Sequence, residues 1–147
     1  MDLILWRHAE AEDGSPDSAR KLTAKGRRQA ERVAKWLAKR LPKKFRVLAS
    51  PARRAQETAA VLARHFETHV ALDVGAPAQA ILDAAGWPRA DERPAVIVGH
   101  QPSLGEAAML ALSGKAAPLN LKKGALVWLA ARDGEVVLRA AIAPDLL

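Results

Sequence analysis

The sequence predicts an α/β fold: a three-layer sandwich with a mostly parallel central sheet, helices on both faces and a C-terminal antiparallel hairpin. Short apolar runs, typical of buried strands, alternate along most of the chain with segments whose apolar residues follow helical spacing. Such alternation makes successive strands parallel and places the helices over the sheet. Near the end, two apolar runs flank Asp133-Gly134. This dipeptide favours a two-residue turn, so the last two strands are predicted to pair antiparallel.

The first half of the chain is predicted to form two strands and two helices. Residues 2–6 are an apolar strand, and Thr23 is a suitable N-cap for a helix that Pro42 ends. The apolar residues of that helix recur at helical spacing: Ala30, Val33, Ala34, Leu37 and Leu41. Residues 45–49 form the second strand, and Pro51 suits the first turn of the next helix. The apolar stripe of this second helix consists of Ala55, Ala59, Leu62 and Phe66.

The second half continues the alternation and ends in the hairpin. The predicted elements are a strand at 69–72, a helix at 77–85, a strand at 95–98, a helix at 102–112 and hairpin strands at 126–131 and 136–142. Gly86 and Gly114 follow the two helices, where glycine is favoured because it adopts positive φ. The chain has 147 residues and no linker, repeat or low-complexity segment, so we expect a single domain over residues 1–147.

The amino-acid composition excludes several classes of function. Cysteine is absent, which excludes disulfides, thiol catalysis and cysteine-based metal sites. No stretch approaches the roughly 20 apolar residues that a membrane-spanning helix needs, so no membrane partner is expected. The apolar run at residues 3–6 is too short for a secretory signal and has no basic segment before it. We therefore expect a cytoplasmic protein.

The net charge of +7, from 23 Lys and Arg against 16 Asp and Glu, favours anionic partners. Many of the cations lie between Lys25 and Arg46, where their pattern is typical of the solvated face of a helix. Nucleic-acid binding by stacking requires aromatic side chains among the basic ones, and only 4% of the residues are aromatic. The charge therefore indicates an anionic substrate, and no nucleic-acid partner is expected.

Three polar clusters each follow directly after a predicted strand: Arg7-His8, residues 50–54 and Gly99-His100. Because ligands bind at the carboxyl ends of the strands in an open α/β sheet, these clusters are expected to meet at one edge. Arginine offers a fork of donors that matches phosphate oxygens, and a neutral histidine can attack phosphorus. Two arginines and two histidines together predict a site for a tetrahedral dianion.

The same clusters carry motifs that resemble those of the histidine phosphatase superfamily. Arg7-His8-Ala9-Glu10 resembles its RHG/RHA signature, and residues 22–30 (LTAKGRRQA) are similar to LTxxGxxQA. Residues 50–59 (SPARRAQETA) resemble SPLxRAxQTA, and residues 99–102 (GHQP) resemble GHNP. The four motifs follow the family's order and span about two thirds of the chain. The resemblance implies a phosphatase that works through a phosphohistidine intermediate.

Carried over residue by residue, the resemblance implies a role for each catalytic side chain. His8 is the phosphorylated nucleophile, and Arg7 is its phosphate-binding neighbour. Arg54, rather than Arg53, is the second phosphate-binding arginine, because it precedes the sequence Ala-x-x-Thr. His100 contacts and stabilises the transferred phosphoryl group. The resemblance requires no metal and no organic cofactor.

A few residues depart from the motifs or lie beside them. Glu57 stands where the family usually has Gln, and Gln101 stands where Asn is common, but neither change removes a catalytic group. Arg20 precedes the second motif and is expected to help bind phosphate. His65 and His69 match no motif and lack the spacing of metal ligands, so they are not expected in the site.

The short connection between the last two motifs favours the SixA-type phosphohistidine phosphatases. Only 41 residues separate Thr58 from His100, and predicted strands and helices use most of them, which leaves little for a lid. Phosphoester hydrolysis also benefits from a general acid. The candidate acids, none of which lies within a motif, are Asp73, Asp83, Asp91 and Glu92. The lack of a clear acid favours a P–N substrate, because imidazole departs as a weaker base than an alkoxide.

The favoured partner is therefore a phosphorylated protein that carries phosphohistidine. One alternative is a small phosphorylated substrate, either a phosphoester or a pyrophosphate metabolite. Another is a phospho-binding module with weak turnover, against which the intact His8 argues. A nucleic-acid binder is a third alternative that rests on charge alone. The sequence makes no prediction of the oligomeric state.

Overall fold

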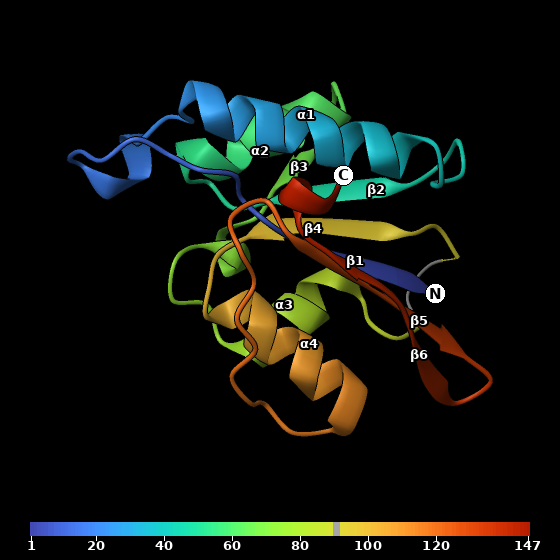
Figure 1. Ribbon diagram of the computed structural model, residues 1–147. Helices are drawn as coiled ribbons and strands as arrows, with labels where there is room; N and C mark the ends of the chain where they lie inside the picture. The colour runs from blue at the N-terminus through green and yellow to red at the C-terminus, as the bar shows by residue number, and fades with distance from the viewer. Residues whose placement is uncertain (90–91) are drawn as a thin grey trace.

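The computed structural model describes residues 1–89 and 92–147 and consists of a six-stranded sheet between two layers of helices (Figure 1). The strands are β1 (Asp2–Arg7), β2 (Arg46–Ala49), β3 (Glu67–Thr68), β4 (Ala95–Gly99), β5 (Leu126–Arg132) and β6 (Glu135–Ile142). The helices are α1 (Ala24–Ala38), α2 (Arg53–Leu62), α3 (Ala78–Ala85) and α4 (Ser103–Ser113). Three short 3-10 helices are η1 (Asp17–Ala19), η2 (Val70–Leu72) and η3 (Pro144–Leu146).

The sheet is mostly parallel, with the strand order β3-β2-β4-β1-β5-β6. β4 pairs parallel with β1 and β2, and β2 pairs parallel with β3. β5 pairs antiparallel with both β1 and β6. Asp133 and Gly134 form the turn between β5 and β6 with φ values of 52° and 80°, the positive values that a type I′ turn requires. The predicted α/β class, the largely parallel sheet and the C-terminal hairpin are confirmed.

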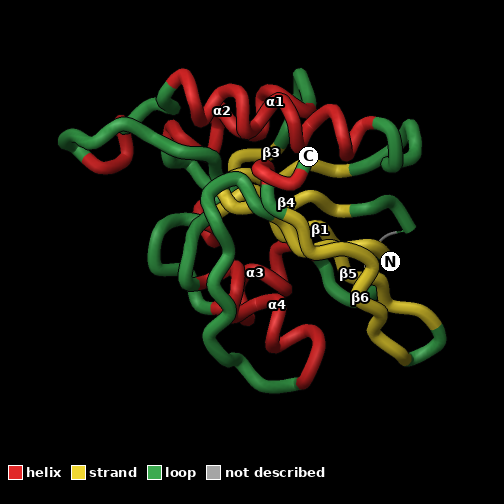
Figure 2. The backbone as a smooth tube through the Cα atoms, in the orientation of Figure 1, coloured by secondary structure: helices red, strands yellow, loops and turns green. Residues whose placement is uncertain are grey.

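Two hydrophobic cores cover the two faces of the sheet. α1 and α2 lie over one face, and α3 and α4 over the other (Figures 1 and 2). Successive side chains of β1 alternate between the cores: Ile4 and Trp6 pack below α1 and α2, whereas Leu3 and Leu5 pack toward α3 and α4. All four are fully buried, which explains why the first strand is a continuous apolar run rather than an alternating one.

The third strand was predicted at the wrong residues. β3 covers only Glu67–Thr68, next to the end of β2, and the backbone of His69 makes the last hydrogen bond to Ala49 O at 2.9 Å. The predicted strand at 69–72 is instead the turn η2, because His69 Nδ1 accepts a hydrogen bond from Ala71 N at 3.2 Å and caps it. Val70, an apolar residue that favoured a strand, is 81% exposed.

Three helix limits also differ from the prediction. α1 ends at Ala38, so Leu41 lies in the turn that follows, although its backbone N still bonds to Leu37 O at 2.8 Å. α2 begins at Arg53, after the N-cap Ala52, rather than at Pro51. The same helix ends at Leu62, so Phe66 packs on the core from outside it.

The start of α1 packs directly against the loop that follows β1. Thr23 is the N-cap, as predicted: its Oγ1 accepts from Gly26 N at 2.9 Å, and its backbone N donates to Glu10 O at 3.0 Å. A Cβ on Gly26 would lie only 2.0 Å from that same carbonyl oxygen. Only glycine therefore allows this approach, which fixes the position of α1 beside the residues that follow His8.

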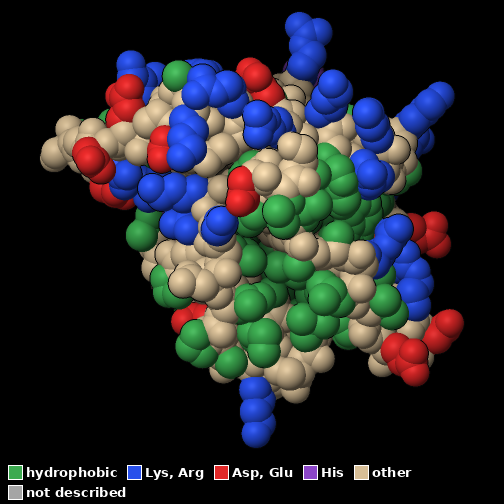
Figure 3. Space-filling model, viewed as in Figure 1, with side chains coloured by type: hydrophobic (Ala, Val, Ile, Leu, Met, Phe, Trp, Pro, Cys, Tyr) green, Lys and Arg blue, Asp and Glu red, His purple; other side chains and the backbone are tan. Residues whose placement is uncertain are grey.

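The exposed surface has a strongly basic part over α1. Figure 3 shows Lys and Arg side chains gathered along this helix, where the sequence predicts a solvated face, with hydrophobic side chains below them. The exposed apolar residues of β6 include Val137 and Leu138, which are 46% and 52% exposed. Within residues 1–89 and 92–147, no helix combines the length and the apolar character needed to cross a bilayer.

Candidate active site

The predicted clusters meet at the carboxyl edge of the sheet. His8 follows β1, Ser50 follows β2 and His100 follows β4, and these three strands are neighbours. The His8 and His100 rings have centroids 5.2 Å apart at an interplanar angle of 56°. His8 is 7% exposed, and His100 and Arg54 are each 4% exposed. The structure therefore places these three predicted residues together in one buried site, which we call the recess.

The orientation of the His8 ring defines which nitrogen can act as a nucleophile. His8 Nδ1 lies 2.7 Å from Ala9 O, and a carbonyl can only accept, so Nδ1 carries the proton. The lone pair is therefore on Nε2, which accepts from Arg54 Nε at 3.3 Å. Thr58 holds the Ala9 peptide in place, because its Oγ1 accepts from Ala9 N at 3.1 Å and donates to Arg54 O at 2.7 Å.

Arg54 connects both histidines to a carboxylate that the sequence analysis missed. Its Nη1 donates to Asp17 O at 2.9 Å, its Nη2 donates to Asp17 Oδ2 at 3.1 Å, and Nη2 lies 3.5 Å from His100 Nδ1. Arg20 does not join this group directly. Its Nη1 donates to Asp17 Oδ1 at 3.0 Å and its Nε to Glu12 O at 2.7 Å. Arg20 therefore contacts Asp17 in this structure, and its role in phosphate binding stays a prediction.

Ser50 holds the second histidine. Its Oγ lies 2.7 Å from His100 Nε2 and also accepts from Ala52 N at 3.2 Å. Since the Arg54 guanidinium only donates, the neutral His100 ring presents a lone pair at Nδ1 and a proton at Nε2. His100 Nδ1 therefore faces the same space as His8 Nε2.

Arg7 contributes a donor that has no partner. Its Nη1 donates to Leu121 O at 2.7 Å, but the buried Nε has no acceptor among the residues that the structure describes. The segment around Leu121 is fixed by two bonds of Gly124: its N donates to His8 O at 3.0 Å, and its O accepts from Trp6 Nε1 at 2.9 Å. The charge of Arg7 lowers the pKa of both His8 and His100, so its side chain lies near the two rings.

Both histidines are held in the neutral form. Burial, and then the nearby charges of His100, Arg54 and Arg7, lower the pKa of His8 to about 3, although the contact with the backbone of Ala9 acts in the opposite direction. Burial, then the charge of Arg54, lowers the pKa of His100 to about 4, although Asp73 and Asp17 act in the opposite direction. The nucleophilic, unprotonated form of His8 is therefore the dominant form at neutral pH.

These pKa values predict that the fold loses stability in mild acid. Below pH 6.5 the unfolded chain protonates both histidines while the folded chain, with pKa values of about 3 and about 4, does not. The free energy of unfolding is therefore expected to be highest above pH 6.5 and to fall on the order of 2–4 kcal/mol between pH 7 and pH 5. Urea unfolding at the two pH values measures this loss.

The control for this prediction is the double variant His8→Asn with His100→Asn. It retains exposed His65 and half-buried His69, so it should lose most of the pH dependence between pH 7 and pH 5. An equal slope in wild type and double variant would contradict the assignment to His8 and His100.

The candidate general acids lie on different elements of the fold rather than together at the recess. Asp73 is the one whose charge acts on His100, and its Oδ1 accepts from Val74 N at 2.7 Å. Asp83 lies on α3 and accepts from Gln79 Nε2 at 2.9 Å. Glu92 is exposed and precedes β4, at the opposite edge of the sheet, and Asp91 lies outside the described residues.

The two departures from the motifs brace the backbone. Glu57 Oε1 accepts from Leu22 N at 3.0 Å, and its Oε2 lies 3.3 Å from Arg27 Nη2, so it joins α2 to the segment before α1. Gln101 donates from Nε2 to Leu119 O at 2.7 Å and accepts from Gly105 N at 2.8 Å. Both residues support the loops around the recess.

Comparison with known proteins decides the family. The sequence model of the histidine phosphatase superfamily (branch 1) matches residues 3–76, half of the chain. The chain belongs to the histidine phosphatase superfamily. An uncharacterized protein from Picosynechococcus sp. strain PCC 7002 is 34% identical over 95% of this chain and 90% of its own length.

Solved structures show the same fold. The protein histidine phosphatase SixA in complex with tungstate has a TM-score of 0.82 at 21% identity and covers 99% of both chains. A proposed phosphohistidine phosphatase SixA from Agrobacterium tumefaciens has a TM-score of 0.79 at 25% identity over 97% of both chains. A variant of the phosphoserine phosphatase from Entamoeba histolytica with phosphoserine has a TM-score of 0.74 at 19% identity, over 99% of this chain and 98% of its own.

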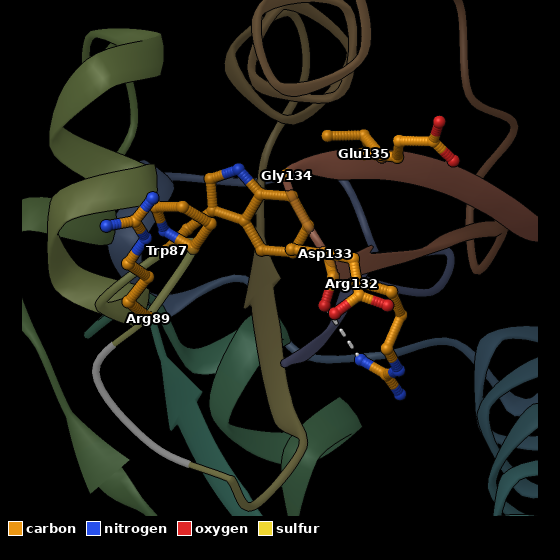
Figure 4. A pocket seen from close by; sticks show the side chains of 9 residues that line it. Trp87, Arg89, Arg132, Asp133, Gly134 and Glu135 are labelled. Atoms are coloured by element: carbon orange, nitrogen blue, oxygen red, sulfur yellow. Dashed lines mark hydrogen bonds between the residues drawn. The ribbon is translucent and has the colours of Figure 1, made fainter.

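The predicted class is thereby confirmed: this superfamily member is a histidine-nucleophile phosphatase with a SixA-like fold. A hollow of about 220 Å³ at the other edge of the sheet lies away from the recess. Trp87, Arg89 and the Asp133-Gly134 turn line it (Figure 4), so Trp87 does not border the recess. Among the described residues, no group of three or more His, Asp or Glu side chains is arranged to hold a metal.

Proposed function

We propose that this phosphatase removes the phosphoryl group from phosphohistidine in a protein, through a phosphohistidine intermediate on His8. The orientation of the His8 ring is the main support for this proposal: Nδ1 donates its proton to Ala9 O, so the lone pair is on Nε2. That atom lies 3.3 Å from Arg54 Nε within a buried recess. An imidazole lone pair beside a guanidinium is suited to attack an incoming anion.

The first step transfers the phosphoryl group to His8. The Nε2 lone pair forms a new N–P bond as the P–N bond of the substrate breaks. The departing imidazole keeps that electron pair and takes a proton from solvent. The donors of Arg54 and the nearby positive charge of Arg7 stabilise the charge on the equatorial oxygens. In the second step water attacks phosphorus, the N–P bond to His8 breaks, and inorganic phosphate leaves.

His100 completes the phosphoryl site. In the neutral ring, Nδ1 is an acceptor 3.5 Å from Arg54 Nη2. A dianion close by favours the protonated ring, because an opposite charge raises the pKa of histidine. Protonated Nδ1 then donates to a phosphoryl oxygen, while Nε2 keeps its contact with Ser50 Oγ at 2.7 Å.

The charge state of the nearby carboxylate supports a P–N substrate. Hydrogen bonds from Arg20 and Arg54 lower the pKa of Asp17, so this group has no proton to donate at neutral pH. A departing alkoxide would need such a proton, whereas imidazole is a much weaker base. Two of the similar solved structures also carry the name SixA, a phosphohistidine phosphatase.

The second candidate function is hydrolysis of a small phosphoester. The phosphoserine phosphatase from Entamoeba histolytica shares the fold over 99% of this chain. In addition, Asp73 is close enough to raise the pKa of His100, so among the described candidate acids it is the one whose charge acts on this histidine.

The test compares a phosphohistidine-bearing protein with a panel of small phosphoesters and pyrophosphate. We expect kcat/KM to be at least about tenfold higher for the phosphohistidine protein, since the leaving group needs no acid. Higher kcat/KM for a small ester, reduced by Asp73→Asn, would move the assignment to the second function. If the protein bound phosphoprotein but hydrolysed none of the substrates, the phospho-binding module would be the one remaining function of the three.

Three further predictions belong to this proposal. They are a cytoplasmic location, a single domain over residues 1–147, and the absence of nucleic-acid and membrane partners. Each stays a prediction from composition and charge. Retention of the purified protein at low salt by DNA, RNA or anionic vesicles would contradict the predicted partners.

A further inference from the structure

The outer face of α1 carries a row of cations outside the recess. They are Lys25, Arg28, Arg32, Lys35 and Lys39. These residues recur every three or four positions, so they share one face of the helix, and all are exposed (Figure 3). At about 1.5 Å per residue this cationic stripe is about 21 Å long. Among the described residues none of the five has an ion-pair partner, whereas Arg27 on another face pairs with Glu57.

The cationic stripe lines a trough between α1 and η3. A first hollow of about 440 Å³ is lined by Glu10, Lys25 and Lys123 together with residues of η3. A second, of about 290 Å³, shares Lys25 with the first and extends to Arg32. A third, of about 360 Å³, continues from Arg32 to Lys39. The second hollow thus shares a lining residue with each of the others, so the three follow one another along the helix, and we call this series of hollows the trough.

The trough begins beside the catalytic recess. Glu10 lies two residues after His8, and Gly26 brings the first turn of α1 against the Glu10 carbonyl. On the other side, Lys123 follows the segment whose Leu121 carbonyl accepts from Arg7 at 2.7 Å. A chain that places a phosphorylated side chain in the recess can therefore continue directly into the trough.

We propose that this trough binds an acidic segment of the phosphoprotein substrate while the phosphohistidine occupies the recess. The inference rests on the proposed function and adds the recognition of the protein that carries the phosphoryl group. Two side-chain carboxylates line the trough, and both have donors: Asp145 pairs with Lys122 at 3.2 Å, and Glu10 accepts from Thr23 Oγ1 at 2.8 Å. The cations of the stripe remain available to attract and orient an anionic segment.

Two other anionic partners fit the trough less well. Trp36 is the aromatic residue that lines it, and the Arg40 guanidinium covers its ring at 4.3 Å from the centroid. The ring is therefore not free to stack on a nucleic-acid base. The apolar face of α1, which includes Val33 and Leu37, is buried in the core, so the helix has no face to insert into a membrane.

The test uses two synthetic 15-residue peptides with a central phosphohistidine, one flanked by Glu and the other by Gln. Seven extended residues on each side reach about 23 Å, which matches the stripe. We expect kcat/KM of wild type to be about tenfold higher for the Glu peptide at low salt and nearly equal for both at 0.5 M salt. The triple variant Lys25→Glu, Arg28→Glu, Arg32→Glu should lose this preference.

A matched control reverses three exposed cations away from the trough: Arg64→Glu, Arg89→Glu and Lys115→Glu. It has the same net charge as the triple variant and should keep the preference for the Glu peptide. Hydrolysis of phosphoramidate, which is too small to reach the trough, should be equal in all three proteins. Equal loss of preference in both variants, or no preference in wild type, would overturn the proposal.

Peptide binding is measured separately from turnover, by fluorescence anisotropy with the unphosphorylated Glu peptide. If wild type binds it, the triple variant does not, and neither phosphohistidine peptide is hydrolysed, the proposed function fails and the trough assignment stands. If instead both phosphohistidine peptides are hydrolysed at equal rates, and wild type and the triple variant bind the Glu peptide equally, the trough assignment fails and the proposed function stands. Tighter binding of a 15-nucleotide single strand or of phosphatidylserine vesicles than of the Glu peptide would overturn the assignment to an acidic protein segment.

Discussion

Replacement of His8 by Ala is expected to reduce kcat/KM by about 10⁴-fold or more, for every substrate that the wild type hydrolyses. The reason is that Nε2 supplies the lone pair for the new N–P bond, and its neighbours cannot replace it. Arg54 and Arg7 are cations without a nucleophilic lone pair, and His100 is protonated at Nδ1 beside a phosphoryl dianion, so that atom has no lone pair to offer either. Steady-state hydrolysis of the best substrate measures the effect.

A second variant separates the chemistry from the fold. In His8→Asn the side-chain amide can still donate to Ala9 O, as Nδ1 does at 2.7 Å, but there is no nucleophile. Both variants should fold and bind inorganic phosphate, because the arginines remain. Rapid quenching should trap an acid-labile phosphoenzyme in wild type and none in either variant. Hydrolysis by His8→Asn at a rate close to wild type would refute the assignment of His8.

The sequence predicts the position of the recess because its side chains follow strands directly. His8 and His100 come immediately after apolar runs that are too hydrophobic to be anything but buried strands. Because parallel strands end at the same edge of the sheet, the two histidines can be predicted to lie close together without knowledge of any side-chain contact. The choice of Arg54 over Arg53, which the resemblance to the family motif implied, also agrees with the geometry: Arg54 is 4% exposed and bonds to His8.

Contacts that depend on loops could not be predicted in this way. Asp17 begins the short helix η1 in an exposed segment with no periodic pattern, and it meets Arg54 because η1 packs against α2. The Leu121 carbonyl that binds Arg7 is a backbone group, which leaves no signature in the side chains. Likewise, sequence spacing could not select Asp73 among the four candidate acids. Asp73 acts on His100 from a different loop, the one that follows η2, and the sequence does not show that the two loops lie close together.

The Asp17 contacts also show what the recess gains when a phosphoryl group arrives. Without substrate, the guanidinium of Arg54 donates to His8 Nε2 and to Asp17. In the proposed mechanism, a phosphoryl dianion offers three oxygens to these donors, in front of Nε2. The donors are already oriented, so little rearrangement of Arg54 is needed during phosphoryl transfer.

Replacement of Arg54 by Ala should therefore have the second-largest effect, a loss of about 10³-fold in kcat/KM. The loss should exceed that of Arg54→Lys, since a lysine keeps the charge but cannot donate to His8, Asp17 and His100 together. The inhibition constant of inorganic phosphate should rise in the same order, because the arginine binds the group that is transferred. Hydrolysis rates and phosphate inhibition of the two variants measure these effects.

The neighbouring arginine provides the matched control. Arg53 begins the same helix, but its side chain is 53% exposed and lies 3.7 Å from Glu57 rather than in the recess. Arg53→Ala removes the same charge one residue away and should change kcat/KM by less than about threefold, since exposed ion pairs contribute little. If the two alanine variants lost activity equally, the effect would come from the net charge of the helix. A large loss confined to Arg54 would instead show that the orientation of its donors, fixed between His8 and Asp17, carries the stabilisation of the phosphoryl group.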